Sequence, residues 1–205
     1  MQTYIFIMEL IGSVAFAISG AIKALHHKMD LFGVCVLGLV TAVGGGVIRD
    51  IVIGQTPPMV FQNPVYAMVA LVVSLLVFWL APHTPHTKEG EKILYAADSI
   101  GLAVFTAVGV EGAYVLGYNR LTIWLFVGII TGVGGGVLRD VFTGTIPHIF
   151  RKHIYATASL VGVLVIWLCN KWMGFMPSLL IGAAVIIVIR TMSMLFHLNL
   201  PKSSD

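Results

Sequence analysis

The chain has 205 residues, of which 58% are hydrophobic and only 10% are charged, and its mean hydropathy is +0.96. Soluble domains are roughly 45–50% apolar and about 25% charged, so the composition excludes an ordinary soluble domain and predicts a surface that meets lipid. The net charge is +3, but no basic cluster exceeds Arg151–Lys152, which argues against a nucleic-acid partner. Cys35 and Cys169 both lie in apolar stretches, where we expect free thiols.

A transmembrane helix needs roughly 20 mostly apolar residues. Short connections with Pro, Asn or charged residues separate seven such stretches, at about 4–23, 31–53, 64–81, 93–116, 121–143, 153–171 and 177–197. The first stretch carries Glu9 and lacks a basic leader and a cleavage site, so we interpret it as a retained helix. The pattern predicts an all-α polytopic membrane protein, with one transmembrane domain over residues 1–205.

The basic residues of the connections predict an orientation. One side of the membrane would hold seven of them, namely Lys23, Lys28, Lys88, Lys92, Arg151, Lys152 and Lys202. The other side would hold only Arg120 and Lys171. Because cytoplasmic loops carry the excess of Lys and Arg, we expect the N-terminus outside and the C-terminus in the cytoplasm.

The sequence contains an internal repeat. TAVGGGVIRDIVIGQTP at residues 41–57 returns as TGVGGGVLRDVFTGTIP at residues 131–147, an offset of 90. The flanks match as well, because Glu9, Gly12, Phe16 and Tyr66 answer Asp98, Gly101, Phe105 and Tyr155. The repeats span about 4–86 and 93–175, and the seventh helix, about 177–197, has no counterpart. Since each repeat holds three spans, the second copy must be inverted, which predicts a 3+3 inverted repeat with the functional site at its interface.

Each repeat carries three adjacent glycines: Gly44, Gly45 and Gly46 in the first, Gly134, Gly135 and Gly136 in the second. Such a triplet costs about 3 kcal/mol of helix propensity. Close helix packing needs small residues only at every fourth position. Three in a row favour a kinked or broken helix that exposes its backbone to a wet path. We therefore expect the triplets to face each other at mid-membrane and to form an hourglass.

An Arg-Asp pair follows each triplet, Arg49-Asp50 and Arg139-Asp140. Ionisable groups within spans are costly and tend to mark an ion or substrate path. Neighbouring side chains on a helix point about 100° apart, so we expect pairing across the repeats rather than within each pair. The expected partners are Asp140 or Asp98 for Arg49, and Asp50 or Glu9 for Arg139. The alternative is that both pairs only anchor helix ends at the interface.

Three further ionisable residues lie within spans. Glu9 and Asp98 occupy matching depths, as cation-attracting groups at the two mouths or as partners of the arginines. Arg190 lies near the middle of the last span. It either faces a pore or an interface, where it is a candidate for gating, or forms a buried structural ion pair. His83 and His86 indicate a solvated loop rather than a metal site. No metal, cofactor or catalytic constellation is predicted, which argues against an enzyme.

The duplicated GGGVIRD and GGGVLRD motifs, on a seven-span chain, resemble the prokaryotic branch of the trimeric intracellular cation (TRIC) channel family. Its bacterial members are also grouped under a glycine-transporter domain name. The resemblance extends from Glu9 to about Leu200. It implies a homotrimer in the bacterial inner (plasma) membrane, surrounded by membrane lipids. Each subunit would carry an hourglass pore for monovalent cations, chiefly potassium, shaped by glycine-kinked second and fifth spans.

The Lys-Glu-Val motif of the animal members is absent, and Arg139 is only an approximate counterpart of its basic residue, so voltage gating stays open. Three functions remain for the chain. A cation channel needs a continuous wet path with exposed acids or carbonyls. A secondary transporter of a small zwitterion such as glycine would use broken helices to hold the carboxylate and an acid to hold the amine. A structural or partner-binding membrane subunit would use the glycines for packing alone.

Overall fold

The computed structural model describes residues 2–81, 87–151 and 154–196, and in these ranges all regular structure is helical. The helices are α1 (Gln2–His26), α2 (Leu31–Val52), α3 (Met59–Gln62), α4 (Val65–Leu80), α5 (Lys88–Val115), α6 (Leu121–Phe142), α7 (His148–Arg151), α8 (Ala156–Met173) and α9 (Phe175–Leu195). The loop histidines His83 and His86 lie outside the described residues, as do Lys152 and Lys202. The expected all-α fold is confirmed.

Six helices are long and apolar enough to cross a membrane: α1, α2, α5, α6, α8 and α9. α4 has 16 residues and is a shorter apolar helix at the position of the third expected span. Every expected span therefore coincides with a helix. The four-residue helices α3 and α7 were not expected, because their sequences are too short to show a helical period.

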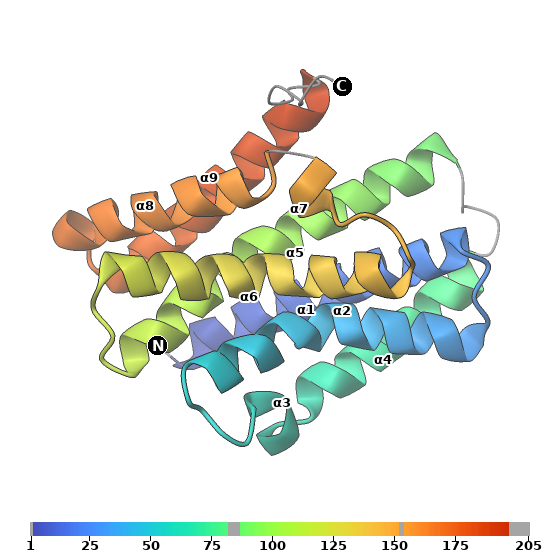
Figure 1. Cartoon of the computed structure of the whole chain (residues 1–205), viewed down its shortest axis with the longest axis horizontal. Helices are drawn as coiled ribbons and strands as arrows, with labels where there is room; N and C mark the ends of the chain where they lie inside the picture. Colours follow the sequence, from blue (N-terminus) through green and yellow to red (C-terminus); the bar gives the residue numbers. More distant parts are fainter. Residues whose placement is uncertain (1, 82–86, 152–153, 197–205) are drawn as a thin grey trace.

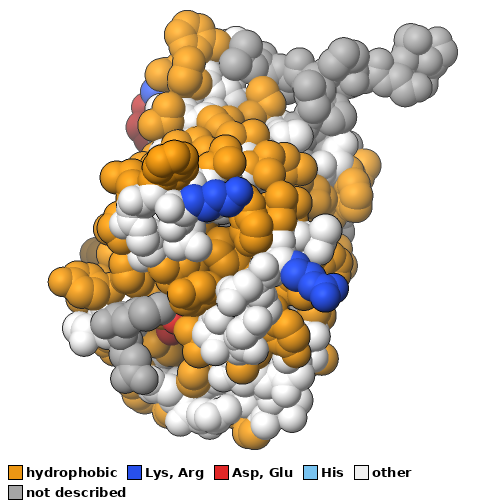
Figure 2. Space-filling model, turned by 90° about the vertical axis from the view of Figure 1, so that its left-hand side faces the viewer, with side chains coloured by type: hydrophobic (Ala, Val, Ile, Leu, Met, Phe, Trp, Pro, Cys, Tyr) orange, Lys and Arg blue, Asp and Glu red, His pale blue; other side chains and the backbone are white. Residues whose placement is uncertain are grey.

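The exposed surface of α4 has the chemistry of a lipid contact. Its exposed side chains recur at helical spacing and are Met68, Leu71, Val72, Leu75, Leu76 and Trp79. Its buried face carries Tyr66, Ala70 and Ser74 instead. In a soluble protein this pattern would be inverted. Figure 2 shows that hydrophobic side chains also cover much of the end of the molecule that lies at the left of Figure 1, with few charged groups among them. The chain is a membrane protein.

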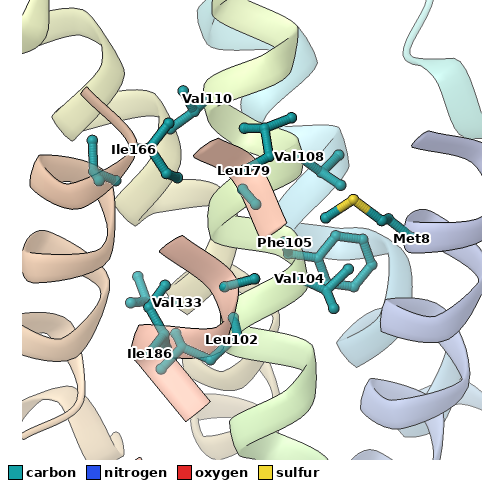
Figure 3. Close-up of a cluster of buried hydrophobic side chains, with 14 of the residues drawn as sticks. Met8, Leu102, Val104, Phe105, Val108, Val110, Val133, Ile166, Leu179 and Ile186 are labelled. Atoms are coloured by element: carbon teal, nitrogen blue, oxygen red, sulfur yellow. The ribbon is translucent and has the colours of Figure 1, made fainter. Parts of the chain in front are cut away.

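The helices form two equivalent groups and one addition. α1, α2 and α4 pack together, and α5, α6 and α8 do the same. The groups meet where α1 contacts α5 and where α2 contacts α6, which lie side by side in Figure 1. α9 packs on α5 and α8. α5 is the most buried long helix, and Figure 3 shows its side chains from Leu102 to Val110 meeting those of α1, α6, α8 and α9.

The glycine triplets form the contact between α2 and α6. A Cβ on Gly45 would collide with the carbonyl oxygen of Thr131, and one on Gly135 would collide with that of Thr41. A Cβ on Gly134 would lie only 3.0 Å from the Cα of Gly45. Both helices run through their triplets without a break. Of the two expected forms, a kinked or a broken helix, the break is therefore wrong and the kink stays a prediction. The bare backbone here admits a neighbouring helix, and close packing uses adjacent glycines on more than one side.

We predict that Gly135→Val lowers the free energy of unfolding by about 2 kcal/mol or more, because its side chain must displace the backbone of α2. Gly46→Ala is the matched control: nothing lies within 4 Å of a Cβ at Gly46, so it should unfold at or above the wild-type temperature. Thermal unfolding of purified protein in detergent measures both. Equal melting temperatures for the two variants would contradict the close contact.

Candidate functional site

A buried ionic cluster centres on Asp98 of α5. Arg139 of α6 donates from Nη1 to Asp98 Oδ1 at 2.6 Å, and Arg190 of α9 donates from Nη2 to Asp98 Oδ2 at 3.3 Å. All three residues are at most 1% exposed. Arg139 Nη1 also donates to Ser19 Oγ of α1, and Arg190 Nε donates to Ser99 Oγ at 3.1 Å. The Asp98 carboxylate thus bridges two guanidinium groups. Through the bond from Arg139 to Ser19, the cluster also reaches α1 in the first half of the molecule.

Two tyrosines enclose the Arg190 guanidinium. Its central carbon lies 4.1 Å from the ring centroid of Tyr95 and 4.8 Å from that of Tyr155. Tyr155 donates its hydroxyl to Asp98 Oδ1 at 3.3 Å. Cation–π contacts of a desolvated guanidinium reach about 2 kcal/mol. Arg190 thus forms the buried ion pair of one interpretation, while its role at a pore or in gating stays a prediction.

The first repeat contains the equivalent cluster with weaker pairing. Arg49 donates from Nε to Asp50 Oδ1 at 2.8 Å, while its Nη1 lies 3.7 Å from Glu9 Oε1. Tyr66 interacts with Glu9, as Tyr155 does with Asp98. The Glu9 side chain is 15% exposed, whereas that of Asp98 is 1% exposed. The sequence-related sets Glu9–Arg49–Tyr66 and Asp98–Arg139–Tyr155 are therefore also related in space.

The expected pairing across the repeats is wrong. Arg49 pairs with Asp50 and Glu9 of its own repeat, and Arg139 pairs with Asp140 and Asp98 of its own repeat. The angle of about 100° separates the Cβ directions of neighbouring residues, but the long arginine side chain curls back and brings Nε onto the next carboxylate. The terminal nitrogens then remain available to the neighbouring helix, α1 or α5.

Asp50 and Asp140 fix the loops that follow α2 and α6. The second carboxylate oxygen of Asp50 accepts from the backbone N–H of Met59 at 2.8 Å, and that of Asp140 accepts from His148 N–H at 2.9 Å. Met59 and His148 are the first residues of α3 and α7. Both oxygens of each aspartate are thus engaged, at 1% exposure. This geometry anchors helix ends, which was the alternative interpretation of the Arg-Asp pairs.

A small cavity opens beside Glu9. It has a volume of about 30 Å³, which is the space of one water molecule. α1 contributes Glu9 and Ser13, α2 contributes Gly46 and Arg49, and α5 contributes Phe105. We call this the outer cavity, because the loop charges predict that this end of the bundle lies outside.

A larger cavity of about 680 Å³ lies at the other end of α1 and is called the inner cavity. It is basic, with lining residues that include Lys23, Lys88, Lys92 and Arg190 and one acid, Glu91. Glu9 and Lys23 are separated by about 20 Å along α1, at 1.5 Å per residue. The two cavities therefore lie at opposite ends of α1.

Phe16 lies between Glu9 and Lys23 along α1 and packs against Phe105 of α5. Their ring centroids lie 5.3 Å apart, at equivalent positions of the two repeats. Phe16 occupies space that Gly101 and Gly135 leave free, and Phe105 packs beside Gly12. The sequence shows these phenylalanines as repeated residues, but their apolar chemistry did not mark them as part of a site.

Glu111 of α5 was not predicted as a site residue. It is half-buried and lies within electrostatic range of both Glu9 and Arg49. The available signal was an acid inside an apolar span. Only the second repeat contains this acid, so the similarity of the repeats did not mark it. Among the described residues, no group of three or more His, Cys, Asp or Glu side chains is placed to hold a metal ion.

Comparisons with known proteins agree with this geometry. A family model described as "Glycine transporter" matches residues 6–82 and 95–171. A crystal structure of a prokaryotic TRIC channel in 0.5 M KCl superposes with a TM-score of 0.91 at 31% identity, over 98% of this chain and all of the other. This chain belongs to the TRIC family. Each match of the family model contains one glycine triplet and one Arg-Asp pair of this TRIC-family protein.

Two further relatives extend over nearly the whole TRIC-family chain. The TRIC trimeric intracellular cation channel orthologue from Rhodobacter sphaeroides has a TM-score of 0.88 at 32% identity, covering 96% of this chain and 100% of that one. The UPF0126 inner membrane protein YadS of Escherichia coli is 39% identical over 95% of this chain and 93% of its own length. The solved relatives are channels rather than enzymes.

We predict that Asp98→Asn lowers the free energy of unfolding by about 3–5 kcal/mol, because it leaves two buried guanidinium groups without their shared carboxylate. The equivalent change Glu9→Gln should cost about 1 kcal/mol or less, since Glu9 is partly exposed and its arginine is more distant. Chemical unfolding in detergent compares the two. A combined Asp98→Asn and Arg190→Met variant should recover part of the loss, and equal losses for Asp98→Asn and Glu9→Gln would refute this account.

Proposed function

We propose that this TRIC-family protein is a monovalent cation channel that prefers potassium, with one hourglass pore in each subunit of a homotrimer. The observation that carries the proposal is the pair of cavities at opposite ends of α1, with Phe16 between them along that helix and packed against Phe105 of α5. The full-length similarity to solved TRIC channels supports the same function. The seven helices would form two inverted three-helix repeats and a seventh helix, in the bacterial inner membrane.

The charge near the outer cavity supports cation selectivity. Glu9, Asp50 and Glu111 lie near a single arginine, Arg49, so acids are in excess. Excess acid at a pore mouth favours cations. The lysines of the inner cavity would face the cytoplasm, where exposed charges are screened within about 8 Å at physiological ionic strength. Selectivity would therefore be set on the outer side.

The glycine triplets would form the waist of the pore. They let the backbones of α2 and α6 touch beside Phe16, so a small bend or slide of either helix would move the phenylalanine pair. A kink at the triplets is part of this proposal as the opening motion. The acids and arginines of the two clusters would hold the remaining helices in place while the waist changes width.

Flux from liposomes tests the proposed function. Vesicles that contain the purified protein should release potassium passively along its gradient, faster than the large cation N-methyl-D-glucamine and without saturating at millimolar concentrations. Protein-free vesicles are the control. Absence of potassium flux, together with saturable uptake of labelled glycine by the same preparation, would replace the channel with a transporter that uses the same helices.

We predict that Phe105→Ala raises potassium flux several-fold, because it removes a ring from the barrier between the cavities. Phe126→Ala, on the exposed surface of α6, is the matched control and should conduct like the wild type. The melting temperature of each variant shows whether it is folded. Unchanged flux in a folded Phe105→Ala variant would exclude the phenylalanine pair as the barrier.

A further inference from the structure

The two repeats contain equivalent polar sites, but only the second site holds an additional guanidinium from outside its repeat. In the second repeat, Asp98 and Tyr155 bind the Arg190 guanidinium, which enters from α9. In the first repeat, the counterparts Glu9 and Tyr66 line the outer cavity. No helix of the described chain supplies a second guanidinium there, because α9 has no counterpart. The outer cavity therefore corresponds in position to the Arg190 site, but without the guanidinium group of an additional helix.

The space around the two sites differs accordingly. A Cβ on Gly136 would lie 2.6 Å from the Tyr155 hydroxyl and 3.5 Å from Asp98 Oδ1, so that site is filled. Nothing lies within 4 Å of a Cβ on the equivalent Gly46. The cavity of about 30 Å³ in front of Gly46 accommodates one water molecule or one ion without its full hydration shell.

The charges differ in the same direction. In the second repeat, two arginines face the two aspartates Asp98 and Asp140. At the site of the first repeat, Arg49 alone faces Glu9 and Asp50 together with Glu111 of α5. Carboxylates removed from water need a positive partner or a changed protonation state. The first repeat therefore lacks positive charge where the second repeat has Arg190.

Ser13 adds a ligand that the second repeat does not have. It is 2% exposed, it lines the outer cavity, and its hydroxyl makes no hydrogen bond to any residue in the described part of the chain. The equivalent position of the second repeat, by the offset of the Glu9 and Asp98 segments, is the apolar Leu102. The hydroxyl oxygen opens onto the cavity, where its two lone pairs can bind a water molecule or a cation.

We propose that the outer cavity binds a single monovalent cation between the carboxylate of Glu9, the hydroxyl of Ser13 and the ring of Tyr66. The cation takes the place that the Arg190 guanidinium occupies in the second repeat. This inference rests on the proposed function and deepens it, because it names where a permeating potassium ion pauses. Glu9 and Ser13 offer fewer oxygens than the roughly six to eight ligands that a calcium ion takes, whereas an aromatic face and a neutral oxygen suit a large monovalent ion.

Rubidium is the probe, because it substitutes for potassium and scatters anomalously. Crystals of the full-length protein soaked in rubidium chloride should show an anomalous peak between Glu9 and Tyr66. In detergent, rubidium should raise the melting temperature in a saturable way at constant ionic strength, balanced with N-methyl-D-glucamine chloride. Glu9→Gln should raise the half-saturating concentration at least tenfold, and the exposed Glu89→Gln should leave it unchanged.

A tethered cation gives an independent measurement. Gly46→Lys places an ammonium group in the cavity and should abolish the response to rubidium. Gly46→Met fills the same space without charge. In buffer free of rubidium and potassium, the lysine variant should melt higher than the methionine variant, because its charge offsets that of Glu9. Equal melting temperatures would mean that the cavity has no preference for a cation.

Failure of this site and failure of the channel give different results. Absence of a rubidium peak, with the same half-saturating concentration in Glu9→Gln and wild type, overturns the site even if potassium flux is intact. Rubidium binding at Glu9 in a protein that gives no potassium flux overturns the proposed channel function and leaves the site.

Discussion

The fold depends on one shared carboxylate. Asp98 binds Arg139 of α6 and Arg190 of α9, and all three side chains are at most 1% exposed. Removing such charges from water costs several kcal/mol for each ion, and only a network that engages most of their donors makes the burial tolerable. In this network two serine hydroxyls accept hydrogen bonds from the arginines. Two tyrosine hydroxyls donate, one to Asp98 and one to the backbone carbonyl of Arg190. Because α9 has no counterpart in the first repeat, Arg190 ties an additional helix to an otherwise duplicated structure.

Duplication and asymmetry together account for the arrangement of the site. The glycine contact between α2 and α6 and the Phe16–Phe105 pair keep the symmetry of the repeats. The ionic clusters on either side of this waist do not follow the symmetry of the repeats. The second repeat is neutralised and closed by Arg190, while the first repeat is acidic and open to a small cavity. In the proposed channel, two copies of one unit inserted in opposite directions would form a pathway that narrows at this symmetric contact.

Apolar length and internal similarity were enough to predict the helices, since a span must be apolar over its whole length and duplicated residues keep equivalent places. Side-chain pairing was not predictable in the same way. The contact between Arg49 and Asp50 depends on how a flexible side chain curls, and Gly135 fits against Thr41 because a particular neighbouring helix passes there. α3 and α7 were missed because an aspartate nine or eight residues earlier holds their first N–H groups, which is a contact and not a sequence period. Glu111 was missed because its importance lies in its neighbours on α1 and α2.

The most direct test of the account is the current through purified protein in a planar bilayer with a tenfold gradient of potassium chloride. A cation pathway through the waist predicts discrete unitary currents that reverse near the potassium equilibrium potential, about 58–59 mV from zero at 25 °C for one charge. Currents that reverse near the chloride potential would contradict the acidic outer mouth as the source of selectivity. Persistent silence, with saturable glycine uptake by the same preparation, would contradict the channel itself.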